Sequence, residues 1–460
     1  MMSTTMGVRP ALATLSIALV FSMCAVPAES AELQAGGITD PTLILTPAPL
    51  PLQPVGTPFT DPTFGSVLRR VSDTSAQGGF ETQIYNQLQA FSPDNSYLLL
   101  DSSNGFIVRR TTDFSLVNGL DTSGWNDPRW HPAKPHTIVH FDSNDDALIR
   151  LQFINIENLQ TTTVWTFPSE YSYIRVPQSF DELSRDGRWL AGMATRNDGA
   201  AVIFALDLKN LIFGAQLPLA DLYAGPCQPD PEWGEIEPDW IGVSSLGNYL
   251  VVQWVRDGTA RCSGLETFNI QTGNFTGRVS DHHHHGDLGL DSDGVTEFFM
   301  TSEDSSPLDH DRPAISMRLL PGNATVSPPI FLTVVDWSDE DHISCQGPNG
   351  VCLVSWGSTG GAYDYPFEKE LFLQYTSGSV FRFVHHRSSQ CGYWVQARAS
   401  MSRDGRYAVF ASDWGEETNT NSCDVWSDPM GKGDPYVVEL EQLKNKYIGP
   451  IMYPLLLFGD

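Results

Sequence analysis

Residues 402–410 read Ser-Arg-Asp-Gly-Arg-Tyr-Ala-Val-Phe, a polar turn followed at once by an apolar run. Similar stretches occur at 92–100, at 184–191 and, with Asp-Ser-Asp-Gly, at 291–300. Asp-Gly and Asp-Asn tolerate the positive φ that a tight hairpin needs, so each copy predicts two antiparallel strands joined by a corner. Corners spaced one or two sheets apart indicate a radial stack of small sheets, a β-propeller.

The corner spacing predicts an all-β fold, a seven-bladed β-propeller with four-stranded antiparallel blades. Three corners are degenerate, at 130–134, 244–248 and 347–350, so rings of six or eight blades remain alternatives. The segment 66–72 is predicted to be a strand that closes the ring. The predicted blades cover residues 80–120, 121–168, 170–225, 233–275, 281–336, 340–388 and 391–440.

The ends of the chain differ in composition from the predicted ring. Residues 1–31 combine Arg9 with an apolar stretch and a zone of small residues, which is typical of a secretory signal peptide. Residues 32–65 are rich in Pro and Thr and predict an extended lead-in. The propeller is expected at 66–445 and a C-terminal tail at 446–460. After removal of the signal peptide, the protein is expected to be secreted or periplasmic.

The charge of the chain narrows the choice of partners. It has 27 Lys and Arg against 55 Asp and Glu, a formal net charge of -28. Nucleic acid and anionic lipid bind through basic surfaces, so neither is an expected partner. No run after the signal peptide has membrane-spanning length, so no membrane insertion is expected. We expect a monomer.

The cysteines predict disulfides. Of the seven, Cys24 lies in the signal peptide and six remain, and an even number in an exported chain favours disulfide pairing. The predicted blade order brings two pairs to one face of the ring and leaves a third flanking the sixth corner. Other pairings within the same fold remain open. The predicted pairs are Cys227–Cys262, Cys391–Cys423 and Cys345–Cys352.

The whole-chain pattern resembles the TolB-type propeller family, whose blades carry Ser-Pro-Asp-Gly corners similar to Ser92-Pro93-Asp94-Asn95. Through 127–130 and 399–405 it is also similar to the propeller polysaccharide lyases of the oligogalacturonate- and ulvan-lyase type. The resemblance covers roughly residues 60–440. It implies the fold and an acidic polysaccharide or other glycan as substrate, although propellers also serve as receptors and scaffolds.

Polar residues recur at one depth of the predicted inner strands. Eight positions before each clear corner Asp, the chain has Asn86, Gln178, His285 and Gln396. In a propeller these positions face one opening of the central channel, which we call the mouth. Polar side chains converging there predict a wet binding site. The alternative is an ordinary water-filled channel with a polar lining.

Residues 282–285 are four consecutive histidines. In extended geometry His283 and His285 share one side with Asp287. Neutral imidazoles accept protons or bind transition metals, so these three residues are the candidate ligands of one divalent metal ion. His310, His342 or Asp341 would complete such a site. The alternative is a solvated loop, and the cofactor remains unknown from sequence alone.

Cations and aromatic residues complete the predicted site. Arg398 lies within the seventh predicted inner strand, and Arg312 lies in a loop that overhangs the mouth, where a local ion pair with Asp309 or Asp311 is the alternative. Aromatic side chains stack on sugar rings or pack between blades. The predicted substrate contacts are Asn86, Gln178, Trp240, Arg312, His342 and Gln396.

These residues suggest three functions. A polysaccharide lyase needs a cation for the uronate carboxylate, a base for the C5 proton and an acid for the leaving oxygen. Arg398 or Arg312 would be the cation. His283 or His285 would be the base, and Tyr393 or a second histidine the acid.

The second function is a non-catalytic exported propeller that binds a glycan or a protein at its mouth, which requires no acid–base pair. The third is glycoside hydrolysis, which requires two carboxylates facing one channel, with Asp287 and Asp341 as candidates. The resemblance favours the lyase.

Overall fold

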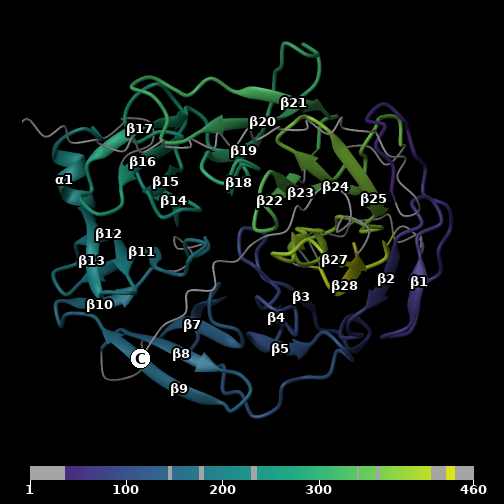
Figure 1. The fold of residues 1–460 in the computed structure, drawn as a ribbon, viewed down its shortest axis with the longest axis horizontal. Helices are drawn as coiled ribbons and strands as arrows, with labels where there is room; N and C mark the ends of the chain where they lie inside the picture. The colour runs from purple at the N-terminus through teal and green to yellow at the C-terminus, as the bar shows by residue number, and fades with distance from the viewer. Residues whose placement is uncertain are drawn as a thin grey trace, which may run out of the picture. The chain divides into compact units, whose positions relative to one another are not determined.

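The computed structural model describes residues 37–142, 148–175, 181–228, 236–338, 341–358, 363–415 and 431–440. These residues form seven antiparallel sheets, arranged as the blades of a ring (Figure 1). Five of the described sheets have four strands, one has three and one has five. The prediction of an all-β, seven-bladed propeller is therefore confirmed.

The first three blades follow one another along the chain. Blade 1 comprises β3 (Glu81–Gln83), β4 (Tyr97–Ser102) and β5 (Ile107–Arg110). An isolated bridge between Arg109 and Leu116 stands in place of a fourth strand, since Asn118-Gly119 follows at once and Asn and Gly disfavour strand pairing. Blade 2 comprises β6 (Asn126–Trp130), β7 (Thr137–Asp142), β8 (Arg150–Asn155) and β9 (Gln160–Thr166). Blade 3 comprises β10 (Tyr171–Ile174), β11 (Trp189–Arg196), β12 (Ala201–Asp207) and β13 (Ile212–Pro218).

The next three blades have four strands each. Blade 4, which follows the short helix α1 (Leu219–Ala224), comprises β14 (Pro238–Val243), β15 (Tyr249–Trp254), β16 (Leu265–Asn269) and β17 (Phe275–Ser280). Blade 5 comprises β18 (Gly286–Leu290), β19 (Glu297–Glu303), β20 (Ala314–Leu319) and β21 (Ile330–Val334). Blade 6 comprises β22 (Asp341–Ser344), β23 (Val351–Trp356), β24 (Glu370–Tyr375) and β25 (Val380–His385).

Blade 7 joins the two ends of the ring. Its strands β26 (Ser400–Met401), β27 (Tyr407–Ser412) and β28 (Asp434–Glu439) come from the C-terminal part, and β2 (Val67–Arg70) and β1 (Pro58–Thr60) from the N-terminal part. β2 pairs antiparallel with β28, with Val67 opposite Glu439 and Arg70 opposite Tyr436. The predicted ring-closing strand at 66–72 is therefore present. Two short 3-10 turns, Ser75–Gln77 and Tyr393–Val395, complete the described elements.

A residue with positive φ occupies every corner between the first two strands of a blade. In the four clear corners these residues are Asn95, Gly187, Gly294 and Gly405, with φ of 61, 72, 73 and 72°. The three degenerate corners use His136, Gly247 and Gly350, with φ of 58, 71 and 77°. The left-handed backbone therefore recurs even where the Asp-Gly signature is lost.

Apolar cores lie between neighbouring blades rather than inside one blade. One core, for example, combines Trp189 and Ile203 of blade 3 with Ile241 and Val252 of blade 4. Each blade is covered on both faces by its two neighbours. Strands such as β11 are therefore buried almost throughout, and their sequences are largely apolar. Burying one large aliphatic or aromatic side chain contributes about 1.5–3 kcal/mol, so the inter-blade cores dominate the stability of the ring.

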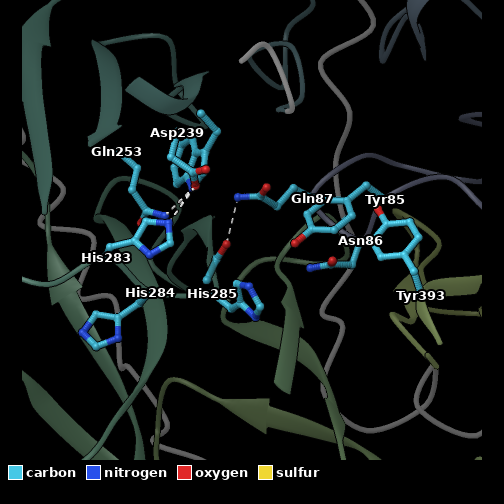
Figure 2. A pocket seen from close by; sticks show the side chains of 11 residues that line it. Tyr85, Asn86, Gln87, Asp239, Gln253, His283, His284, His285 and Tyr393 are labelled. Carbon is cyan, nitrogen blue, oxygen red and sulfur yellow. Dashed lines mark hydrogen bonds and ion pairs between the residues drawn. The ribbon is translucent and has the colours of Figure 1, made fainter. Parts of the chain in front are cut away.

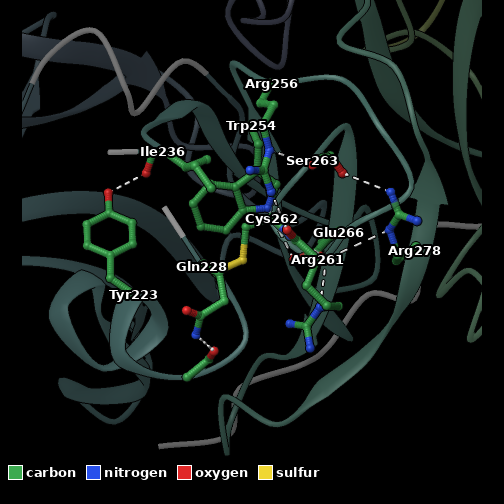
Figure 3. Close-up of a disulfide and its surroundings, with 12 residues drawn as sticks. Tyr223, Gln228, Ile236, Trp254, Arg256, Arg261, Cys262, Ser263, Glu266 and Arg278 are labelled. Carbon is green, nitrogen blue, oxygen red and sulfur yellow. Dashed lines mark hydrogen bonds and ion pairs between the residues drawn. A yellow bond between two sulfur atoms is a disulfide. The ribbon is translucent and has the colours of Figure 1, made fainter. Parts of the chain in front are cut away.

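Two of the three predicted disulfides are confirmed. Cys227 bonds to Cys262, 35 residues further on, and Cys345 bonds to Cys352 across the sixth corner. Figure 3 shows Cys262 beside Glu266, whose carboxylate accepts a hydrogen bond from the Cys262 backbone N–H at 2.9 Å. The third predicted pair, Cys391–Cys423, stays a prediction because Cys423 lies outside the described residues, as does the predicted signal peptide.

The described part of the Pro-rich lead-in lies along blades 6 and 7. Buried side chains of the propeller donate hydrogen bonds to its carbonyl groups: Arg382 to Leu43 at 2.8 Å, and Trp414 to Leu50 at 2.8 Å. A proline-rich chain offers more acceptors than donors, so side-chain donors are the natural way to hold it. No described helix is long and apolar enough to cross a membrane.

Candidate functional site

The first strands β14, β18 and β22 lie toward the centre of the ring (Figure 1). Several first strands are irregular where they begin. β6, β10 and β14 each contain a register shift near the first residue. Such bulges change the direction of the side chains beside them. Side chains at the mouth therefore depart from the simple alternation of a regular strand.

A loop of blade 1 crosses the central channel. β3 ends at Gln83, and residues 84–90 leave the sheet. The Asn86 side chain donates to the Ile343 carbonyl at 2.6 Å, and Gln87 donates to the Gly286 carbonyl at 2.9 Å. The Gln89 side chain donates to the Met401 carbonyl at 2.8 Å. The loop is thus tied to blades 5, 6 and 7, and it carries Tyr85 into the centre of the mouth.

A pocket of about 250 Å³ lies beside this loop. Figure 2 shows imidazoles and amides from several blades facing it, with Tyr85 and Tyr393 on one side. Its lining residues are Tyr85, Asn86, Gln87, Asp239, Trp240, Gln253, His283, His284, His285, Gly286 and Tyr393. We call it the histidine pocket.

The four consecutive histidines precede β18 and separate from one another. His282 lies 3.7 Å from carboxylate oxygens of both Asp257 and Asp281. The others approach one carboxylate each: His283 Nε2 lies 3.1 Å from Asp239, His284 Nε2 4.0 Å from Glu303, and His285 Nδ1 3.7 Å from Asp341. Figure 2 shows His284 turned away from the two tyrosines, whereas His283 reaches Asp239.

His285, which precedes β18, lies against Asp341 and His342 at the start of β22. The hydrogen bond with Asp341 raises the pKa of His285. Burial raises the pKa of Asp341, but its interactions with His285 and Ser302 outweigh burial, and the net pKa is lowered. His342 stacks on His285 with ring centroids 5.1 Å apart. Burial and the neighbouring His285 lower the pKa of His342 well below its usual range, so His342 is neutral where His285 holds its proton.

His283 and Asp239 form a second histidine–carboxylate pair. Burial raises the pKa of Asp239, but hydrogen bonds from His283 and Gln253 outweigh burial and lower it. The Gln253 amide lies 3.2 Å from the same carboxylate oxygen. Asp239 is therefore an ionised acceptor that fixes the orientation of the His283 ring, a common arrangement around proton-transferring imidazoles.

A second pocket of about 350 Å³ shares Tyr85 and Tyr393 with the first. Aromatic rings, two carboxylates and one guanidinium surround it, and we call it the arginine pocket. Its lining residues are Gln83, Ile84, Tyr85, Leu88, Asp101, Phe106, Trp125, Asn126, Asp127, Pro128, Tyr393, Trp394 and Arg398. The two pockets meet at the tyrosine pair.

Arg398 is the principal charge of the arginine pocket. Its residue is 1% exposed, and its guanidinium carbon lies 4.1 Å from the Tyr393 ring centroid and 5.4 Å from that of Trp394. Within the described structure, neither its Nε nor its Nη2 has a hydrogen-bond partner. Its φ of 36° is also unusual for a residue with a side chain. A buried guanidinium cannot shed its charge, so its unmet N–H groups favour a bound anion.

The two carboxylates of the arginine pocket differ. Burial raises the pKa of Asp101, and the nearby positive charge of Arg398 opposes that rise. Burial raises the pKa of Asp127 to about 6, and its ion-pair partner is Arg129. Of these two carboxylates, Asp101 is thus the one whose charge interacts with that of Arg398.

The structure brings most of the predicted site residues to these pockets. His283, His285, Asn86 and Trp240 line the histidine pocket, and Tyr393 lines both. Trp240 is 4% exposed and also packs in a core with Phe299. His342 is buried behind His285 and lines neither pocket.

Other predicted residues lie elsewhere. Arg312 pairs with Asp309 at 2.9 Å, which is the local ion pair considered as its alternative. Gln396 lines neither pocket, and Gln178 lies outside the described residues. Arg398 precedes its blade's first strand, which begins at Ser400, and is not within it.

Asp287 does not share a side with the histidine pair, contrary to the prediction. It is fully buried inside β18, and its carboxylate accepts hydrogen bonds from the backbone N–H of Cys345 at 2.6 Å and from the Gln346 amide at 3.1 Å. The prediction failed because β18 begins only at Gly286, so the histidines and Asp287 do not belong to one continuous strand. This burial also removes Asp287 from any open carboxylate pair with Asp341.

The predicted metal ligands therefore do not come together. In the described part of the chain, no three His, Cys, Asp or Glu side chains are grouped so as to hold a metal ion. His283 and His285 each interact with their own carboxylate instead. In this arrangement, these residues do not fit a metal centre.

Several lining residues escaped the sequence analysis, above all Tyr85, Asp239 and Asp101. Tyr85 is adjacent to Asn86, but its position depends on the channel-crossing loop. Asp239 lies at the bulged start of β14, between Pro238 and Trp240. The only sequence signal for Asp239 was its place beside the predicted Trp240.

No family model matches the chain, and no curated protein matches it. Among solved structures, an oligogalacturonate lyase in complex with manganese matches with a TM-score of 0.54 and 12% identity, over 88% of this chain and 98% of that chain. The oligogalacturonate lyase of Vibrio parahaemolyticus matches with a TM-score of 0.51 and 11% identity, over 83% and 96%. This chain has the fold of the oligogalacturonate lyases. TolB from Acinetobacter baumannii matches with a TM-score of 0.33 and 12% identity, over 64% and 62%.

The expected resemblance to the oligogalacturonate-lyase propellers is thus confirmed for the fold. At these identities the match extends to the path of the backbone and no further, because one propeller fold supports many unrelated sites. The function has to be argued from the two pockets of this chain.

Proposed function

We propose that the protein is an exported polysaccharide lyase that cleaves a uronate-containing glycan by β-elimination at the propeller mouth. One observation carries the proposal: Tyr393 lines one pocket together with His283 and His285 and the other together with Arg398. A guanidinium whose Nε and Nη2 have no hydrogen-bond partner among the described residues therefore shares one wall with two oriented imidazoles.

Elimination begins with the uronate carboxylate. The proton on C5 is acidic enough to remove only when the charge that develops on the carboxylate is stabilised. Arg398 supplies this stabilisation, since its free N–H groups match a carboxylate in shape and charge. The Tyr393 ring, against which the guanidinium lies, holds it in place.

The proton transfers belong to the two histidines. His283, oriented by Asp239, takes the C5 proton on the ring nitrogen that does not face Asp239. The electron pair of the C5–H bond forms the C4–C5 double bond, and the bond from C4 to the leaving oxygen breaks. His285, whose pKa Asp341 raises, donates its proton to that oxygen. Asn86 and Trp240 contact the sugar rings.

Two features support export. Disulfides persist in oxidising compartments, and two are present in the described residues. The predicted signal peptide at 1–31 agrees with them. Together these features support a secreted or periplasmic protein, and we propose that it acts on its glycan as a monomer.

The test is incubation of the purified protein with a panel of uronate polysaccharides while ultraviolet absorbance of unsaturated products is followed. We expect product from at least one polysaccharide, and its loss in His283→Ala and in Arg398→Met. Far-ultraviolet circular dichroism checks that both variants keep their strands. Absence of product across the panel, with glycan binding retained, would favour a non-catalytic binding propeller.

A further inference from the structure

Carboxylates outnumber Lys and Arg among the described lining residues of the two pockets. Three carboxylates belong to the lining, those of Asp101, Asp127 and Asp239, and Asp341 lies behind His285. Among the described lining residues, Arg398 is the only Lys or Arg. The described lining thus offers one permanent positive charge beside three carboxylates, of which Asp127 is already paired with Arg129.

The composition of the internal segments outside the described residues agrees with this balance. The internal segments outside the described residues contain no Lys or Arg, although several contain Asp or Glu. Arg312, the other cation predicted for the mouth, is already paired with Asp309. The segments concerned are 143–147, 176–180, 229–235, 339–340, 359–362 and 416–430.

A chain of consecutive uronates carries one carboxylate on every ring. If Arg398 bound the carboxylate of one ring, the carboxylates of the adjacent rings would lie near Asp101 or Asp239. Like charges repel at such short range. Neutral rings avoid this repulsion, because carboxylates accept hydrogen bonds from sugar hydroxyls. The aromatic side chains Trp125, Phe106 and Trp394 of the arginine pocket also suit the apolar faces of uncharged rings.

We infer that the ligand of this mouth is a glycan in which an isolated uronic acid is flanked by uncharged sugars, rather than a run of consecutive uronates. The inference rests on the proposed glycan-binding site and names its substrate class. Asp101 is the specificity-determining residue, since it lines the arginine pocket together with Arg398, whereas the other carboxylate there, Asp127, is paired with Arg129.

Binding of matched trisaccharides tests the inference. The probes are trigalacturonate, its derivative methyl-esterified at both outer carboxylates, and the fully esterified form, each also made in the glucuronate series. Isothermal titration calorimetry at low salt is expected to show that the monocarboxylate binds roughly tenfold tighter than the trianion. The fully esterified form is expected to bind more weakly than the monocarboxylate, because it cannot pair with Arg398. High salt is expected to shrink the difference between the first two probes.

Two variants locate the preference. Asp101→Asn is expected to bring the affinity for the trianion close to that for the monocarboxylate. Asp113→Asn removes the same charge from an exposed turn, where Oδ1 accepts hydrogen bonds from Ser115, and is expected to leave the preference unchanged. Thermal melts verify that both variants fold.

The outcomes separate this inference from the lyase proposal. If the trianion binds as tightly as the monocarboxylate or more tightly, or if no probe binds in either series, the inference is overturned. Unsaturated product formed from the trianion in the same experiment would still support a lyase. Preferential binding of the monocarboxylate without any product supports the inference and counts against catalysis.

Discussion

The guanidinium carbon of Arg398 lies 4.1 Å from the centroid of the Tyr393 ring, and in the described structure its Nε and Nη2 lack hydrogen-bond partners. Contact with a ring offsets part of the cost of burying a charge, but it does not replace hydrogen bonds to the N–H groups. The free protein is therefore expected to bind an anion at this guanidinium, beside the tyrosine that the two pockets share. Strained and unsatisfied groups of this kind concentrate at functional sites.

The first prediction concerns Arg398→Met. Removing the cation is expected to lower kcat/KM on a uronate glycan by about 100-fold or more, because the developing carboxylate charge loses its stabilising partner. The free energy of unfolding is expected to stay level or to rise by about 1–3 kcal/mol, since an unsatisfied buried group disappears. Urea denaturation and initial rates measure the two effects.

Arg382→Met is the matched control. Arg382 is equally buried, but it pairs with Glu370 through two contacts of 2.6 and 2.7 Å. Its loss leaves a buried carboxylate without its partner and is expected to destabilise the fold by about 3–5 kcal/mol. Similar destabilisation by the two substitutions would refute the view that Arg398 lacks a partner in the free protein.

The second prediction concerns the pH dependence of activity. If His285 is the acid, the alkaline limb of the kcat profile reports the loss of its proton. Asp341 raises the pKa of His285, so Asp341→Asn is expected to move this limb to lower pH. Asp309→Asn, on a partly exposed carboxylate paired with Arg312, is expected to leave the limb in place. An unmoved limb in Asp341→Asn would assign the acid to another group.

The same pair affects stability in a defined pH window. The raised pKa of His285 contributes stability that is present below its unfolded value and is lost as pH rises through the folded value. The lowered pKa of Asp341 contributes stability that is present above its unfolded value and is lost as pH falls. The contribution of the pair is therefore expected to be largest between these limits, and Asp341→Asn to remove it there.

The fold could be predicted from sequence because its determinants are local. Each blade needs one left-handed corner and short apolar strands, and both can be recognised from the residue types along the sequence. Even the ring-closing strand at 66–72 could be located. It precedes the first blade and has no predicted hairpin partner, so the last blade is the sheet that it can complete. The additional strand β1 and the reduced fourth strand of blade 1 had no such signal.

The site was harder to predict because it depends on departures from regular strands. Counting back from the corners found Asn86 and His285, but it assumed that each inner strand runs unbroken to the mouth. In blade 1 the strand stops at Gln83 and the chain crosses the channel, which brings Tyr85 to the centre. The late start of β18 likewise separates Asp287 from the histidines. These interruptions arise from long-range hydrogen bonds, such as that from Gln87 to Gly286, which no local pattern encodes.

The third prediction compares the two described disulfides. The bond between Cys227 and Cys262 closes a longer loop than that between Cys345 and Cys352, with separations of 35 and 7 residues. Chain-entropy arguments predict that their removal by paired Cys→Ser substitutions costs about 4 and about 2 kcal/mol. Chemical denaturation under oxidising conditions measures both. A larger loss for the shorter loop would show that native-state strain or unfolded-state structure dominates.

The fourth prediction concerns the buried carboxyl group of Asp287. Burial raises its pKa to about 8, although N–H groups of Cys345, Leu288 and Gln346 donate to it and oppose the rise. Folded protein therefore binds more protons than unfolded protein between about pH 4 and that value, so this group lowers the free energy of unfolding as pH rises through the window. Asp287→Asn keeps an oxygen acceptor for only some of these donors, and it cannot ionise. Its free energy of unfolding is expected to fall less steeply than that of the wild type from pH 5 to pH 8, as measured by urea denaturation at each pH. Parallel slopes in the two proteins would mean that Asp287 is already ionised in the folded ring, held by the donors around it.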